Sequence, residues 1–123
     1  MSNNKSFTFE LNGKNIDMVV HALEHIVPYP GNPKDHPPSQ IKTITKSIKD
    51  FGFKQPIVID ENNIIVAGHA RFEASKASGL TEILCVSAAD LTPKQIKAYR
   101  ILDNELAKQG STNIDSLLAE IAL

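Results

Sequence analysis

An apolar strand that runs through a glycine straight into a helix is the feature that most constrains the fold of this chain. Ile64–Ala67 is apolar and rich in β-branched residues, Gly68 follows it, and His69 and Arg71 stand in the first turn of the next helix. Backbone N–H groups at a helix start have no intrahelical acceptor and the dipole is positive there, so an anion binds readily beside a guanidinium. The junction therefore predicts a phosphate site. For the short string alone, the alternative is a glycine that eases a tight turn before two exposed polar residues.

The length and composition fit one folded domain. A chain of 123 residues with 41% hydrophobic and 22% charged residues can bury a core without disulfide bonds or structural metal ions. The single cysteine, Cys85, cannot form an internal disulfide. With no apolar run of membrane-spanning length and no signal-like N-terminus, the sequence predicts a cytoplasmic protein without membrane contact.

The charge balance limits any role with nucleic acid. With 13 basic and 14 acidic residues the net charge is −1, so the basic surface of a strong standalone DNA binder is missing. Lys42, Lys46 and Lys49 fall opposite an apolar stripe, which is typical of a solvated helix face. DNA contact is therefore expected to be local or shared with another protein.

The first third of the chain predicts a hairpin, a loop and a helix. Two β-rich runs, 7–11 and 16–20, flank an Asn-Gly turn. Residues 28–38 hold five of the seven prolines, which predicts a stiff loop. An apolar stripe at Ile41, Ile44, Ile48 and Phe51 then predicts a helix that ends at a glycine.

The remainder predicts a mixed α+β domain. Runs 56–60 and 64–67 form a second hairpin, and small residues mark a helix over 69–78. A continuous apolar run at 83–86 predicts a strand buried on both faces, with Cys85 in the core. A Thr-Pro start predicts a helix from Pro93 to about 108, with Ile96, Tyr99, Leu102 and Leu106 as its apolar positions.

The end of the chain predicts one more helix. An amphipathic stretch within 111–123 stops abruptly on apolar residues. We therefore divide the chain into a tail and hairpin (1–22), a central domain (23–110) and a C-terminal helix (111–123) that leads into a further domain or docks a partner.

Four blocks carry a resemblance to a known family: G-N-P-K at 31–34, F-G-F-K-Q-P-I-V at 51–58, G-H-A-R at 68–71 and D-N at 103–104. In this order and spacing they resemble the ParB/sulfiredoxin-like domain over about residues 23–108. The likeness is greatest to the ParB-like domains of phages and mobile elements and of certain DNA-modification methyltransferases. The resemblance implies a small mixed sheet with β-hairpins packed against three to four helices.

The resemblance also implies a set of binding residues. In nucleotide-binding ParB proteins a G-E-R-R motif holds the triphosphate of CTP, and an E-N pair on the following helix helps to hold phosphate and magnesium. By resemblance, the contacts here are Gly68, His69, Arg71, Gln55, Asn32, Lys34, Asp103 and Asn104. A nucleoside triphosphate with Mg²⁺ is the implied cofactor.

The departures from the family pattern are informative. His69 and Ala70 replace the acidic residue and the first arginine of the ParB motif, which removes a bidentate donor and weakens the case for CTP specificity. Sulfiredoxins place a cysteine where this chain has His69, so their sulfinic-acid chemistry is not expected.

Three functions remain open. The first is a DNA-transaction module that binds a nucleotide or nucleic-acid phosphate at Gly68–Arg71. The second is a metal-dependent ParB-like nuclease or nucleotidase, with His69 as general base or acid and Asp103 as metal ligand. The third is the N-terminal recognition domain of a DNA methyltransferase, with a fused or associated enzyme as partner. DNA is the expected partner in each, and a homodimer is a further possibility that the residues leave open.

Overall fold

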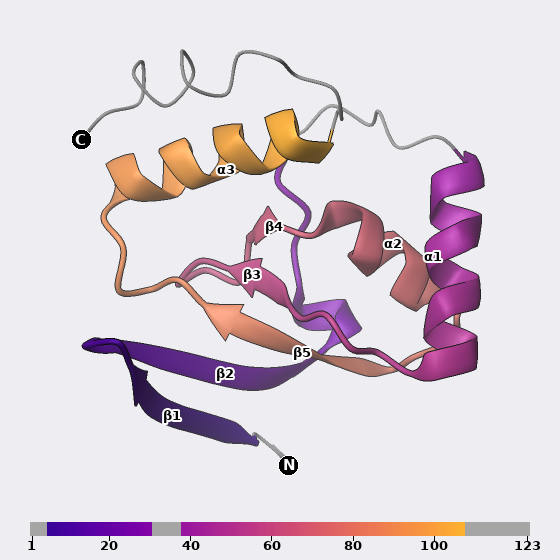
Figure 1. The fold of residues 1–123 in the computed structure, drawn as a ribbon, viewed down its shortest axis with the longest axis horizontal. Coiled ribbons are helices and arrows are strands. Elements are labelled where there is room, and N and C mark those ends of the chain that lie inside the picture. Colours follow the sequence, from indigo (N-terminus) through magenta and orange to yellow (C-terminus); the bar gives the residue numbers. More distant parts are fainter. Residues whose placement is uncertain (1–4, 31–37, 108–123) are drawn as a thin grey trace.

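A five-stranded sheet forms the centre of the computed structural model, which describes residues 5–30 and 38–107, without the side chains of residues 104–107. The strands are β1 (Ser6–Leu11), β2 (Lys14–Ala22), β3 (Ile57–Ile59), β4 (Ile65–Ala67) and β5 (Glu82–Ser87). The helices are α1 (Pro38–Phe51), α2 (His69–Ala77) and α3 (Pro93–Ala107), with a 3-10 turn, η1 (Leu23–His25). The predicted mixed α+β architecture is confirmed (Figure 1).

The strand order is β1-β2-β5-β3-β4, so the N-terminal hairpin joins the sheet through the last strand of the chain. Neighbouring strands are antiparallel except β3 and β5, which are parallel. Asn12 (φ 53°) and Gly13 (φ 78°) form the predicted tight turn between β1 and β2. The hairpin at residues 7–20 is therefore confirmed, and it belongs to the same sheet as the rest of the domain.

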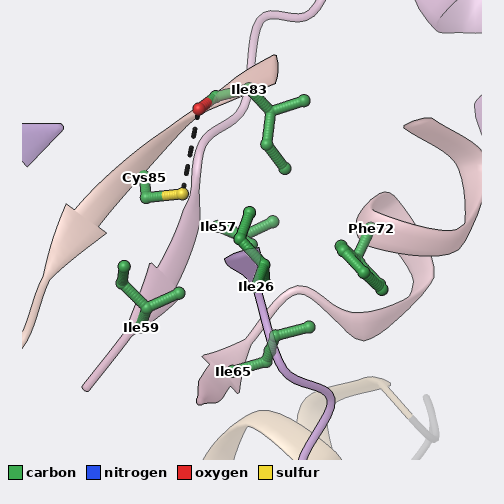
Figure 2. Packing of buried hydrophobic residues seen from close by; sticks show 7 residues of the cluster. All are labelled: Ile26, Ile57, Ile59, Ile65, Phe72, Ile83 and Cys85. Carbon is green, nitrogen blue, oxygen red and sulfur yellow. Dashed lines mark hydrogen bonds between the residues drawn. The ribbon is translucent and has the colours of Figure 1, made fainter. Parts of the chain in front are cut away.

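The main core lies between the sheet and α2. Ile57, Ile59 and Cys85 of the sheet pack with Phe72 of α2 and with Ile26, and Figure 2 shows these side chains pointing toward one another. Cys85 has no exposed surface, so its predicted place in the core is confirmed. A second, smaller cluster forms where Ile96 of α3 packs on Val66 of β4. Helices thus cover both faces of the sheet at the β3–β4 end.

Three predictions about apolar positions are wrong. Phe51 is 70% exposed although it continues the stripe of α1. α1 packs against α2, and this contact does not bury Phe51 at the end of α1. Tyr99 of α3 is 41% exposed, and Leu84 and Val86 of β5 are only half-buried, so the described elements fully cover β5 on one face alone.

Other boundaries agree with the sequence. α2 ends where Gly79, at φ 80°, turns the chain and the Leu80 N–H bonds to the Ser75 carbonyl at 3.2 Å. α3 begins with a reciprocal cap, because Thr92 Oγ1 accepts from the Gln95 N–H and Gln95 Oε1 accepts from the Thr92 N–H. None of the helices in the described part is long and apolar enough to cross a membrane. The helix expected within 111–123 lies outside the described residues.

Candidate phosphate site at the start of α2

Gly68 occupies a position that no other residue type fits. Its φ is +102°, a left-handed conformation in which side chains are strained. A Cβ atom at this position would lie 2.7 Å from Cγ2 of Ile57 and 3.1 Å from Nη2 of Arg71. The missing side chain therefore lets β4 turn directly into α2 above the core strand β3, and it leaves room for the Arg71 guanidinium.

The backbone at this junction presents hydrogen-bond donors. The first hydrogen bond of α2 runs from the Phe72 N–H to the Gly68 carbonyl at 2.9 Å. The N–H groups of Ala70 and Arg71 precede this bond, so they have no acceptor within the helix. They point out of the positive end of the helix dipole, which is the geometry that binds anions.

Arg71 reaches back from α2 to the segment before β3. Its Nη2 donates to the Pro56 carbonyl at 3.2 Å. Its Nε is buried and has no hydrogen-bond partner among the described residues. Buried N–H groups are rarely left unpaired, so this nitrogen is a feature that calls for an explanation. The guanidinium is held in place by one bond and keeps further donors beside the helix start.

His69 is positioned by the chain segment that follows η1. The backbone N–H of Tyr29 donates to Nε2 of His69 at 3.2 Å. A ring nitrogen that accepts a hydrogen bond carries no proton, so Nε2 is unprotonated while this contact is made. Nε2 can therefore act as a base only after it gives up the Tyr29 N–H.

Arg100 of α3 contacts residues beside the candidate site, and the sequence analysis did not predict this role. Its guanidinium carbon lies 3.9 Å from the centre of the Tyr29 ring, a close cation–π stack. Its Nε donates to the Ile65 carbonyl at 3.1 Å, and its Nη2 lies 3.5 Å from Oδ2 of Asp60. Arg100 thus ties α3 and the Tyr29 segment to β4, immediately before Gly68. Nothing in the local sequence signals a pair as distant as Tyr29 and Arg100.

A family model fits this fold and these residues. The model of the ParB N-terminal domain matches residues 11–104. The chain belongs to this family. The match includes the second strand of the N-terminal hairpin together with the site.

Two proteins illustrate the range of relatives. The chain is 31% identical over 80 residues to the ParB-like nuclease domain-containing protein YnaK of Escherichia coli, over 65% of this chain and 92% of the relative. It is 33% identical over 86 residues to the probable chromosome-partitioning protein ParB of Campylobacter jejuni, over 67% of this chain. That match spans only 31% of the Campylobacter protein, which is much longer than the shared domain.

Solved structures show the same fold. Caulobacter crescentus ParB in complex with CTP-gamma-S superposes with a TM-score of 0.63 at 19% identity, over 85% of this chain and 61% of that one. Sulfiredoxin from Arabidopsis thaliana superposes with a TM-score of 0.57 at 24% identity, over 67% and 94%. The predicted ParB/sulfiredoxin-like fold is confirmed.

The structure describes only some of the other residues that the sequence predicted for the site of this ParB N-terminal domain. Gln55 is exposed in the bend beside Pro56, the carbonyl partner of Arg71. Asp103 is half-buried on α3, one turn beyond Arg100, and the backbone of Asn104 follows it in the helix. Asn32 and Lys34 lie outside the described residues. α3 packs against β4, and Asp103 and Asn104 belong to its C-terminal half, so their part in the site stays a prediction.

The structure also bears on metal and thiol chemistry. Across residues 5–30 and 38–107, no three His, Cys, Asp or Glu side chains gather to hold a metal ion. Asp103 as a metal ligand therefore stays a prediction that needs partners from elsewhere. Burial raises the pKa of the Cys85 thiol to about 12, so a thiolate is not available near neutral pH.

Proposed function

We propose that this domain binds the phosphate groups of a nucleoside triphosphate or of nucleic acid at the start of α2, and that it serves a DNA transaction. The observation that carries the proposal is the Gly68 junction. There a residue without a side chain brings the Arg71 guanidinium and the open N–H groups of α2 to one point.

Each residue has a distinct part in this proposal. Arg71 supplies the positive charge and donors beyond the one that bonds to the Pro56 carbonyl, among them Nε, which has no partner within the described residues. The N–H groups of Ala70 and Arg71 supply uncharged donors along the helix axis. His69 contributes its ring at the rim, where Nε2 accepts from the Tyr29 N–H. Asp103 and Asn104 would assist from α3, with Mg²⁺ if a nucleotide is the ligand.

The family supports both kinds of ligand. Caulobacter ParB has been solved with CTP-gamma-S and, in another structure, with the centromeric parS site. In this chain His69 and Ala70 leave Arg71 as the only arginine of the 68–71 motif. We therefore propose that the site recognises the phosphate groups of its ligand and not the base.

Calorimetric titration tests the nucleotide arm. The whole chain is titrated with CTP, ATP and GTP in the presence of Mg²⁺, alongside Arg71→Ala and a control variant, Lys76→Ala. Lys76 is exposed in the last turn of the same helix, so its loss removes one charge without touching the site. We expect Arg71→Ala to weaken binding about tenfold or more, since charge-assisted hydrogen bonds are lost, and Lys76→Ala to bind normally.

Gel shifts over a salt series test the nucleic-acid arm. Binding led by phosphate contacts weakens steeply as salt rises, and Arg71→Ala should weaken it equally on unrelated sequences. The proposal is contradicted if no nucleotide gives heat and DNA binding is absent or insensitive to both salt and Arg71→Ala.

The second candidate is a metal-dependent nuclease or nucleotidase, which the name of the Escherichia coli relative favours. It requires His69 to release the Tyr29 N–H before Nε2 takes a proton. Supercoiled plasmid incubated with Mg²⁺ or Mn²⁺ should then be nicked by the wild type and not by His69→Ala. Equal nicking by both proteins would reject His69 as the base.

A further inference from the structure

One face of the N-terminal half of the sheet is apolar, and none of the elements within residues 5–30 and 38–107 covers it. Directly opposed residues of antiparallel strands share a face, so the pairings of β1 with β2 and of β2 with β5 define it. We call it the outer sheet face, and its apolar members are Phe7, Phe9, Leu11, Ile16, Met18, Val20, Leu84 and Val86.

The exposure of this face is large for a folded domain. Phe7, Phe9 and Leu11 are 59%, 46% and 55% exposed, and the other members are half-buried. α3 lies on this side of the sheet but packs only at its far end, on Val58 and Val66 of β3 and β4. Figure 1 shows α3 at a distance from β1 and β2. Contiguous apolar patches of this kind mark interaction sites.

The opposite face of the hairpin shows that the pattern is not accidental. There Thr8, Glu10, Asn15 and Asp17 alternate with the apolar residues, and Thr8 Oγ1 donates to Asp17 at 2.7 Å. The hairpin therefore turns a largely polar face to one side and, apart from Lys14 at the turn end, an apolar face to the other. An apolar face of three strands is what one half of a β-sandwich presents to its partner sheet.

The charges at the two ends of the face indicate which partner fits. Lys14 stands at the turn end, opposite Leu11, and Glu82 stands at the open end, opposite Ala22. Both are exposed, and neither makes an ion pair with any residue that the structure describes. A surface with an apolar middle and opposite charges at its ends is complementary to itself when one copy is turned end for end.

We propose that a second copy of this chain covers the outer sheet face, in a two-fold dimer with the two sheets packed face to face and their strands reversed. In this arrangement Lys14 of each copy lies over Glu82 of the other, while a packing with strands in the same direction would oppose like charges. The dimer forms without nucleotide, because the Gly68 junction takes no part in it.

The dimensions predict a weak dimer. From a rise of about 3.3 Å per residue and a strand spacing of about 4.8 Å, the face measures roughly 27 by 14 Å. This is at the small end of specific interfaces, so we expect a dissociation constant on the order of 10–100 μM.

Sedimentation equilibrium of the whole chain from 5 to 500 μM tests the proposal, with those concentrations set to bracket roughly the expected range. We expect a monomer–dimer equilibrium in the wild type and in Asn15→Lys. Phe9→Lys adds the same charge on the other face of the hairpin and should weaken association at least about tenfold. Circular dichroism melts of the variants report whether each remains folded.

A charge exchange separates this arrangement from other contacts. Lys14→Glu and Glu82→Lys should each weaken the dimer, and the double variant should restore it, because each copy again meets its opposite charge. A wild type that stays monomeric throughout, a dimer indifferent to Phe9→Lys, or a double variant weaker than both single ones would overturn the proposal. Covering of the face by another part of the chain or by a different protein would appear as the first of these outcomes.

Discussion

The unit formed by β3, β4 and α2 and the hairpin formed by β1 and β2 share one sheet but are built in opposite ways. In the first, Ile57 and Ile65 have no exposed surface, and a Cβ added at Gly68 would lie only 2.7 Å from the Ile57 side chain. In the second, every residue of β1 is exposed and nothing lies within 4 Å of a side chain added at Gly13. The candidate site is therefore fixed by close packing around it, whereas most of the hairpin is exposed to solvent.

A pair of glycine substitutions should give the largest contrast. Both Gly68 and Gly13 have positive φ, but only at Gly68 would a new Cβ meet the Ile57 side chain at 2.7 Å. We expect Gly68→Ala to lower the free energy of unfolding by about 4 kcal/mol, from strain and overpacking together, and Gly13→Ala by about 1 kcal/mol, from strain alone. Urea denaturation followed by circular dichroism measures both. Equal losses would show that the junction is not the tighter of the two turns.

Truncation of side chains should show the next largest difference. Ile57→Ala empties a fully buried site and should cost about 3 kcal/mol. Phe9→Ala removes a larger side chain that is 46% exposed and should cost less than about 1 kcal/mol at low protein concentration. If the loss of unfolding free energy caused by Phe9→Ala grows with protein concentration, the result supports the dimer. A large loss in dilute protein would mean that the hairpin face is buried within one chain.

Loss of Arg100 should have an intermediate effect. Arg100→Ala removes the donor to the Ile65 carbonyl and the stack on Tyr29, and it leaves Asp60 without its cation. We expect a loss of about 2 kcal/mol. Lys97→Ala, an exposed neighbour on α3, should change the melting temperature very little. If Arg100→Ala and Lys97→Ala have the same melting temperature, the contacts of Arg100 do not stabilise the packing of α3 beside the site.

The pH dependence from Cys85 should be the smallest effect. Burial raises the pKa of this thiol from 9.0 to about 12, so above pH 9 the unfolded chain releases a proton that the folded chain keeps. Stability from this group is full below pH 9 and falls as the pH rises toward 12, by about 1 kcal/mol between pH 9 and 10. The Cys85→Ala variant should lack this fall in stability when its unfolding free energy is measured against pH beside that of the wild type. Identical profiles would mean that the thiol ionises equally in both states.

Local signals in the sequence predicted much of the fold. The Asn-Gly turn, the glycine-led start of α2 and the Thr-Pro start of α3 each depend on residues that are neighbours in the chain. Each of these elements is where the sequence placed it. The resemblance in four short blocks was sufficient to identify the family.

Features that depend on distant partners were not predictable. Phe51 and Tyr99 satisfy the periodicity of their helices, but none of the elements that the structure describes buries them. The continuous apolarity of β5 suggested burial on both faces, and only the strand order shows that one face opens to solvent. In the site, the Tyr29 contacts with His69 and Arg100 join residues about 40 and 71 positions apart, which no local pattern encodes.

The strand order also governs how the molecule assembles. The β3–β4 pairing joins residues as close as 59 and 65, whereas the β2–β5 pairing joins residue 17 to residue 87. Closing such a long loop is slow, so we expect β3, β4, α2 and β5 to come together before the N-terminal hairpin docks. During that interval the free edge of β5 is open to the hairpin of another molecule. The first strands to be synthesised are therefore the last to join the sheet, and concentrated refolding should favour exchange of hairpins between chains.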